Sequence, residues 1–340
     1  MSSKSLNDRD SGQDILSLPS SSGEGMGTQG FLASPIEKIH AGGGRICVAS
    51  HGQKAVFSEL SATYPLKLLS PRIAQDGVAV VYILSYGGGL VSGDRVDLSV
   101  DVQLGANLVL LSQGSTKVFK SRPGQRLASV KSRHDFSNTD ASMSPLTRQN
   151  MLFTVKAHSA LFLLPDPVTC FRDASYNQVQ RFELFEDASL VVLDWFTSGR
   201  KSLGEEWVFS RYYSINEIFV DGKRIAKDVT LLDDKLINAK LPPRTLGDRL
   251  APYSCYAMVL LYGPKLQETI GHITAEYGQI SVFKARSPAD LIWSLSPINS
   301  AGAVVRVAGR ETETVKLWLQ KALRGIEHVV GTDVYQRAFV

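Results

Sequence analysis

Apolar and polar residues alternate at every second position along much of the chain, which is the period of a half-buried β-strand. The clearest example runs from Val96 to Leu104, where every even-numbered residue is apolar and the residues between them are polar. Comparable runs predict strands at 45–50, 78–86, 96–104, 108–111, 152–155, 160–164, 180–185, 189–195, 207–220, 255–262 and 303–308. The pattern predicts a mainly β fold with little room for crossover helices, and it disfavours a parallel α/β sheet.

Turn residues separate these runs. Gly105-Ala106-Asn107 and Glu186-Asp187 are two such breaks, and Asp221-Gly222 is the plainest. An Asp-Gly pair between two alternating runs is typical of a type I′ hairpin, because both central residues need positive φ. We therefore expect a hairpin that joins residues 215–220 to residues 223–226.

The glycine-rich segment 87–93 leads into a strand rather than a helix. Phosphate-binding glycine loops depend on the free N–H groups of a following helix, and their GxGxxG and GxxxxGK[ST] signatures do not occur in this segment. We interpret Gly87 to Gly93 as a sharp corner that needs positive φ or a close backbone approach, which excludes a conventional nucleotide site.

Helical periodicity occurs only towards the C-terminus. The first helix has apolar residues at Leu266, Ile270, Ile273 and Tyr277, and it ends before Gly278. The second follows the strand at 303–308, ends near Gly325, and has its apolar face at Val315, Trp318, Leu319, Ala322 and Leu323. Two α-helices near the C-terminus are therefore expected to cap or flank the β body.

The chain divides by composition into a tail, one domain and a short end segment. Residues 1–35 are rich in Ser, Gly, Asp and Asn, a composition typical of disorder. Residues 122–148 are also polar and predict a surface insertion. We predict a disordered tail at 1–35, a single β domain at 36–330 and a C-terminal tail at 331–340.

Overall composition favours a soluble cytoplasmic protein. Hydrophobic residues make up 44%, charged residues 21%, and the net charge is +4, which predicts no nucleic-acid surface. The apolar runs are too short to cross a membrane, and no signal-peptide h-region begins the chain. The three cysteines show no CxxC spacing, so neither a disulfide framework nor a zinc ribbon is expected.

Candidate chemistry rests on acidic residues. A GxSxG elbow and HxxxH or HExxH pairs are absent from the sequence. Asp166 and Asp173 bracket Cys170, and Asp194 precedes a segment that contains Glu205 and Glu206. These groups could bind a divalent metal such as Ni²⁺, serve as the carboxylate pair of a β-helical glycosidase, or simply be solvated turn residues.

Four segments together resemble the urease accessory protein UreD family, called UreH in some bacteria. Their most specific elements are the GGLVSGD corner with Asp94, the STKVFKS run, the LPDP step, and the pair of GR and GE steps that contains Glu205. The segments themselves are 87–121, 160–176, 190–207 and 219–225. The likeness spans most of residues 40–325; the 1–35 tail and the 122–148 insertion depart from it.

The resemblance implies a β-helix-like stack of strands with two α-helices near the C-terminus. It also implies a scaffold without enzymatic activity or a tightly bound cofactor. Such a protein binds apo-urease together with a UreF-like accessory protein and a UreG-like GTPase, and it assists nickel delivery through a polar internal passage. Asp94, Asp173 and Glu205 lie in family-like motifs and are our candidates for lining a transient nickel path; Asp166, Cys170 and Glu206 are weaker ones. The alternatives are a β-helical carbohydrate-active enzyme that uses Asp/Glu pairs and a metal-independent interaction scaffold.

Overall fold

Eight strands in the middle of the chain alternate between two sheets, A and B. The computed structural model describes residues 39–120, 146–233, 244–280 and 289–339. In sheet B these strands are β4 (Val78–Ser85), β6 (Asn107–Leu111), β9 (Ala160–Leu164) and β12 (Ser189–Thr197); in sheet A they are β5 (Arg95–Val102), β8 (Thr147–Val155), β11 (Ser175–Leu184) and β15 (Arg211–Val220).

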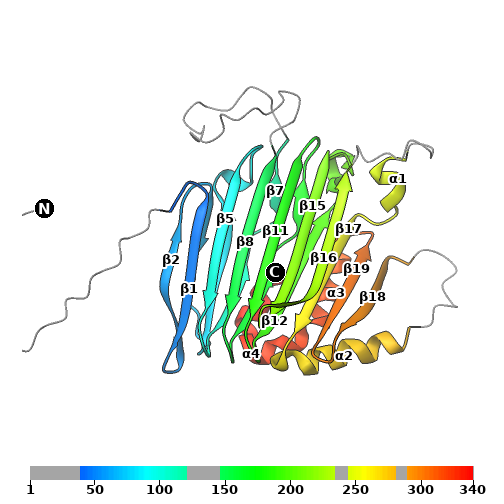
Figure 1. Cartoon of the computed structure of the whole chain (residues 1–340). Coiled ribbons are helices and arrows are strands. Elements are labelled where there is room, and N and C mark those ends of the chain that lie inside the picture. The colour runs from blue at the N-terminus through cyan, green and yellow to red at the C-terminus, as the bar shows by residue number, and fades with distance from the viewer. Residues whose placement is uncertain (1–38, 121–145, 234–243, 281–288, 340) are drawn as a thin grey trace, which may run out of the picture. The chain divides into compact units, whose positions relative to one another are not determined.

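Successive strands within each sheet are parallel, and the strand between them in sequence lies in the other sheet. Each crossover is therefore a strand and not a helix, which is why no βαβ pattern occurs in this part of the sequence. The winding is that of a β-helix with two sides (Figure 1). The prediction of a mainly β fold is confirmed.

Further strands, most of them antiparallel to their neighbours, complete both sheets. Sheet A has the order β16-β15-β11-β8-β5-β1-β2, with β1 (Gly43–His51), β2 (Lys54–Ala62) and β16 (Lys223–Asp233). Sheet B has the order β18-β19-β17-β12-β9-β6-β4-β3, with β3 (Leu66–Leu69), β17 (Cys255–Tyr262), β18 (Leu291–Ile298) and β19 (Gly302–Gly309). The short strands β7 (Thr116–Val118) and β10 (Val168–Cys170) extend sheet B, and β13 (Gly199–Arg200) pairs with β14 (Glu205–Glu206).

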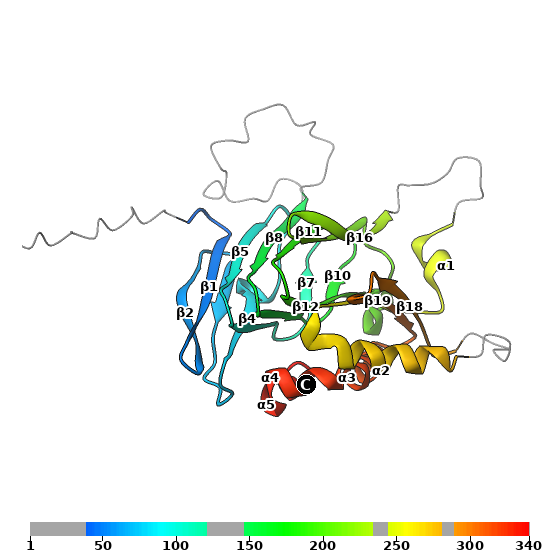
Figure 2. The same cartoon turned by 60° about the horizontal axis from the view of Figure 1, so that its bottom comes forward.

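Helices cover one face of sheet B, so that the molecule has three layers, as Figure 2 shows. The helices of this layer are α2 (Gln267–Gly278), α3 (Thr312–Ala322), α4 (Glu327–Val330) and α5 (Thr332–Arg337). Helix α1 (Leu246–Leu250) lies apart from them, and its Leu246 is buried with the residues between the sheets. The two predicted helices correspond to α2 and α3. Residues 331–340, which the sequence set apart as a tail, include α5, whose Val334 and Tyr335 are buried in the core under the helices.

Two hydrophobic cores follow from this layering, one between the sheets and one between sheet B and the helices. Strand β12 contributes to both because its side chains alternate. Val191, Leu193 and Trp195 pack on the helix side, whereas Leu190, Val192 and Phe196 face sheet A. Asp194 occupies one of the positions that face sheet A.

The glycine corner and the hairpin have the geometry expected of them. Gly87, Gly88 and Gly93 have φ values of 71°, 76° and 80°. Gly89 is a close approach, since a Cβ there would lie 2.6 Å from the Lys117 carbonyl oxygen. Both central residues of the Asp221-Gly222 turn have positive φ, as a type I′ turn requires.

Some expectations fall partly or wholly outside the residues that the structure describes. The tail predicted at 1–35 lies outside them, as does most of the insertion predicted at 122–148. Thr147 and Arg148 at the end of that range already belong to β8. Residues 39–340 form one compact unit.

Candidate functional site

The acidic residues singled out in the sequence lie in the connections that run from sheet B to sheet A. Asp94 lies between β4 and β5, Asp173 between β9 and β11, and Glu205 between β12 and β15. Because the linked strands are parallel within each sheet, all these connections lie at one end of the molecule, the upper end in Figure 1. Asp166, Cys170 and Glu206 belong to the same connections.

Asp94 is buried and stabilises its own turn. Its carboxylate accepts a hydrogen bond of 2.9 Å from the Val91 N–H, and its backbone N–H donates to the Val91 carbonyl oxygen. The Asp94 carbonyl oxygen also accepts from the Arg148 N–H at the start of β8. These contacts fix the glycine corner against the neighbouring strand.

Glu205 is held by arginine side chains. Its carboxylate forms an ion pair with Arg200 at 2.7 Å and lies 3.6 Å from Arg172. These contacts, with the Arg200 hydrogen bond first, lower the pKa of Glu205. Asp173 is exposed and has φ of 60°, so it occupies a left-handed turn position.

The weaker candidates also have structural partners or are inert. Asp166 accepts hydrogen bonds from Gly114 N–H and the Ser112 hydroxyl, and Glu206 accepts from Ser198. Burial raises the pKa of the Cys170 thiol far above its usual range, which keeps it neutral. Across the described ranges, no three His, Cys, Asp or Glu residues form a group that could hold a metal ion.

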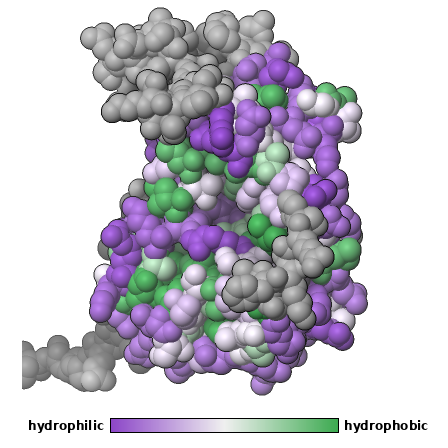
Figure 3. Space-filling view, turned by 90° about the vertical axis from the view of Figure 1, so that its right-hand side faces the viewer, coloured by the Kyte–Doolittle hydropathy of each residue, from purple (hydrophilic) through white to green (hydrophobic). Residues whose placement is uncertain are grey.

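A cavity of about 380 Å³ opens between the two sheets at their β16 and β18 edges. Sheet A ends at β16, whereas sheet B continues to β19 and β18, so the inner face of these last strands is not covered by a strand of sheet A. Figure 3 looks at this side of the molecule and shows a hollow in it. Most of the lining is apolar or aromatic, including Phe196, Tyr256 and Met258, and three charged side chains face the space.

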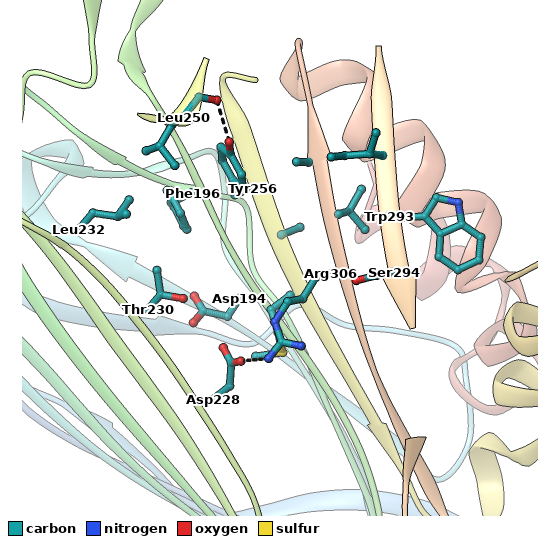
Figure 4. Close-up of a pocket in the computed structure, with 15 residues that line it drawn as sticks. Asp194, Phe196, Asp228, Thr230, Leu232, Leu250, Tyr256, Trp293, Ser294 and Arg306 are labelled. Atoms are coloured by element: carbon teal, nitrogen blue, oxygen red, sulfur yellow. Dashed lines mark hydrogen bonds and ion pairs between the residues drawn. The ribbon is translucent and has the colours of Figure 1, made fainter. Parts of the chain in front are cut away.

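Those charged side chains are Asp194, Asp228 and Arg306, which Figure 4 shows pointing toward one another. Arg306 on β19 forms an ion pair with Asp228 on β16, so the pair links the two sheets at their edges. The Asp228 side chain is only 11% exposed. Charged side chains are seldom this enclosed unless they are paired.

Asp194 lies deeper and accepts hydrogen bonds from four side chains of sheet A. Its Oδ2 accepts from Ser214 at 2.6 Å and from Asn216 at 2.7 Å; its Oδ1 accepts from Tyr212 and the Gln178 amide, each at 3.3 Å. The carboxyl borders the cavity, and protein surrounds it on its other sides. Burial, the largest effect, and the nearby Asp228 carboxylate raise the pKa of Asp194, although the hydrogen bonds from Ser214, Asn216 and Tyr212 oppose the rise.

A buried polar network continues from Asp194 between the sheets. The Tyr176 hydroxyl lies 2.8 Å from the Gln178 amide oxygen and 3.0 Å from that of Gln149. Two further buried amide oxygens, of Gln180 and Asn216, have no hydrogen-bond partner among the described residues. Such unmatched groups are uncommon in folded proteins and call for an explanation.

The strand register places residues of the cavity and of the polar network in two rows that face each other, one row in each sheet. Gln180, Asn216 and Asp228 are direct neighbours across β11, β15 and β16. In sheet B, Asp194, Met258 and Arg306 are neighbours across β12, β17 and β19. The Asn216–Asp194 hydrogen bond and the Asp228–Arg306 ion pair join the rows, the first inside and the second at the edge.

The cavity is therefore a better candidate site than the turn carboxylates. Its lining combines space for water with carboxylate and hydroxyl groups and contains no cysteine or histidine. Amide groups of the polar network lie behind Asp194. Oxygen groups of this kind bind hard or borderline divalent cations weakly enough to release them.

In the sequence, Asp194 was noted as an acidic residue but was not named as a candidate site residue. Asp228 and Arg306 were not predicted at all. A signal was present in β12, where a carboxylate stands at an inward position of the apolar run Leu190 to Phe196. Asp228 gave no such signal, because β16 is an edge strand with charged residues on both faces.

Comparisons with known proteins show which protein family this chain belongs to. A family profile described as UreD urease accessory protein matches residues 40–338, and the chain belongs to this family. It is similar to "Urease accessory protein 4" of Cryptococcus neoformans, with 38% identity over 88% of this chain and 95% of that protein. It is also similar to "Urease accessory protein D" of Arabidopsis thaliana, with 32% identity over 86% of this chain and 99% of that protein. A bacterial relative, "Urease accessory protein UreD" of Sorangium cellulosum, is 33% identical over 87% of this chain and 84% of its own length.

Within the described ranges, the search for a helix long and apolar enough to span a membrane finds none.

Proposed function

We propose that this chain is a scaffold that binds apo-urease together with a UreF-like accessory protein and a UreG-like GTPase, and assists nickel delivery into the urease active site. In this role it is not an enzyme and binds nickel only in transit. The proposal rests first on family membership, because the relatives that span nearly the whole fold are named as urease accessory proteins.

The cavity between the sheets supports the nickel part of the proposal. A protein that passes a metal ion to a partner needs oxygen ligands and water, because a cage of thiolates and imidazoles would retain the ion. The cavity lining and the polar network behind it offer carboxylate, hydroxyl and amide oxygens. Asp94, Asp173 and Glu205 remain proposed contributors at the upper end, although Glu205 is already occupied by arginine.

A carbohydrate-active enzyme gains no support from the relatives, whose names describe accessory proteins. In the cavity, the Asp228 carboxylate is neutralised by Arg306, which leaves Asp194 as the carboxyl group there without a basic partner. A glycosidase needs two carboxyl groups acting together on one bond.

Co-purification tests the scaffold function. The tagged full chain, expressed at its native level in its own cells, is expected to capture urease without nickel together with the UreF-like and UreG-like proteins. Urease already loaded with nickel should be captured less. Recovery of the tagged chain without urease or either accessory protein, under conditions where all are expressed, would contradict the proposal.

A further inference from the structure

We propose that strand β18 is a self-association site, at which two copies of this chain join their sheets B edge to edge by antiparallel pairing. The proposal rests on the backbone hydrogen-bonding groups that β18 leaves free and on the absence of charge along this strand. It goes beyond the proposed function and does not depend on it.

Strand β18 ends sheet B, with β19 on one side and no described strand on the other (Figure 1). The Arg310 N–H donates to the Asp290 carbonyl oxygen, and these two residues continue the register of β18 with β19. Hydrogen-bonded pairs recur at every second residue of an antiparallel ladder, so the even-numbered residues of β18 bond to β19. The backbone groups of Leu291, Trp293 and Leu295 therefore point away from β19.

Pro297 agrees with this assignment and limits the length of the free edge. It is also odd-numbered, so β19 needs no N–H group from it, and edge strands accept proline at such positions. The residues that offer both an N–H and a carbonyl oxygen at the edge are thus Leu291, Trp293 and Leu295. Free groups in such a row form a template for another extended strand.

Strand β18 also lacks the charges that the other edge strands carry. Its residues Leu291–Ile298 include no Lys, Arg, Asp or Glu. The other described edge strands of the two sheets have charged residues: Lys223, Arg224, Lys227, Asp228 and Asp233 in β16, Lys54 and Glu59 in β2, and Lys67 in β3. Charged side chains on an exposed edge oppose pairing with another chain, and β18 presents no such obstacle.

A second copy of β18 matches this edge in both hydrogen bonding and charge. If two β18 strands run antiparallel about a twofold axis at Trp293, Leu291 of each copy lies opposite Leu295 of the other, and the two Trp293 residues lie opposite each other. All three free residues then form hydrogen-bonded pairs, about six backbone bonds in total, and Pro297 lies outside the paired stretch. Because the strand is uncharged, the twofold axis brings no like charges of β18 together, and the contact closes as a dimer.

Apolar side chains on both faces of β18 would be covered by this pairing. On the cavity side, Ile292 is 47% exposed and would lie opposite Ser294 of the other copy. On the helix side, the Trp293 ring lies 5.3 Å from the ring of Tyr277 and 5.0 Å from that of Trp318, so the aromatic cluster borders the edge. Aromatic residues are enriched in interfaces. A contact along one strand is smaller than a standard interface, so we expect a weak dimer with a dissociation constant on the order of 10 µM.

Paired charge substitutions test the contact and its register. Ile292→Lys combined with Ser294→Lys places a lysine of each copy directly opposite a lysine of the other and should weaken dimerisation at least about tenfold. Ile292→Glu combined with Ser294→Glu should do the same. When the lysine and glutamate variants are mixed, each lysine lies opposite a glutamate, so a mixed dimer should form. Restoration by mixing could not arise from misfolded variants.

The matched control is Val56→Lys combined with Ser58→Lys on β2, the edge strand at the far end of sheet A. Val56 is 46% exposed and Ser58 is also exposed, so the control adds the same charges at the same spacing to a comparable edge. It should dimerise like the wild type.

Sedimentation equilibrium of the full chain, with any affinity tag removed, measures the dissociation constant at about 1–200 µM protein, a range that brackets the expected value. Circular dichroism checks that each variant is folded. A wild type that remains monomeric over the whole range would overturn the inference. Dimerisation that the lysine pair at Ile292 and Ser294 leaves unchanged would also overturn it, because the contact would then lie elsewhere, and so would a mixture of the lysine and glutamate variants that remains monomeric.

Discussion

Replacing Asp194 with asparagine should stabilise the apo-protein at neutral pH. The substitution removes an enclosed charge and keeps the size of the side chain. Its new amide NH₂ can occupy the Oδ2 position, where the Ser214 hydroxyl can accept instead of donate. Asn216 can turn its amide so that its unmatched oxygen accepts the other N–H.

The size of the effect follows from the raised pKa of Asp194. Each unit by which folding raises the pKa of a carboxyl group costs the ionised protein about 1.4 kcal/mol. The hydrogen bonds to Asp194 oppose part of the rise, and the cavity gives water some access. We expect the variant to gain about 1 kcal/mol in free energy of unfolding, or roughly 2 °C in melting temperature for a chain of this size.

The gain should depend on pH in a defined direction. Because the pKa is higher in the folded state than the unfolded value of about 3.9, the wild type carries no ionisation penalty below that value. The penalty develops as pH rises from the unfolded pKa to the folded pKa, and it is complete above the folded pKa. The difference between variant and wild type should therefore be smallest near pH 4 and should grow to a plateau towards neutral pH.

Urea unfolding of both proteins in metal-free buffer, followed by circular dichroism from about pH 4 to pH 8, measures this difference. The matched control is Asp101→Asn, which removes a carboxylate from the outer face of strand β5 in sheet A and should stay within about 0.5 kcal/mol of wild type throughout. A variant that is less stable than wild type at neutral pH, or a difference that shrinks as pH rises, would refute the reasoning.

Three further substitutions test the fold by urea unfolding, and the third also by amide hydrogen exchange. Gly89→Ala should lose about 2 kcal/mol or more, because the new Cβ would lie 2.6 Å from the Lys117 carbonyl oxygen; near-wild-type stability would contradict that packing. Gly271→Ala on helix α2 has open space around it and should gain about 0.5–1 kcal/mol, so a loss would show that the position is constrained. Thr245→Ala removes the capping box of α1 and should cost about 1 kcal/mol and speed amide exchange at Asp248; unchanged exchange there would show that the cap contributes nothing.

The central strands could be predicted from the sequence because each has one face or both faces in a core. The alternation in Val96 to Val102 matches the burial of β5 residue by residue. The edge strands β2, β3 and β18 were missed, since much of their surface is exposed and the polar pattern carries less information. The sequence also gave no indication of α5, which is short and obtains its order by packing Val334 and Tyr335 on sheet B.

The candidate site was harder to predict from the sequence than the fold was. Motif likeness drew attention to turn residues such as Glu205, whose acidic character serves an ion pair with Arg200. The cavity depends instead on which inward-facing residues of different strands are brought into one row, as Asn216 and Asp228 are. That register joins segments far apart in sequence, so alternation within a single strand could suggest Asp194 but not its partners.

The most direct measurement of the central claim is the nickel content of urease purified from cells in which the gene for this chain has been deleted. We expect urease to accumulate in these cells with little nickel and little activity, and reintroduction of the wild-type gene to restore both. Urease with its full complement of nickel and normal activity in the deletion strain would contradict the claim.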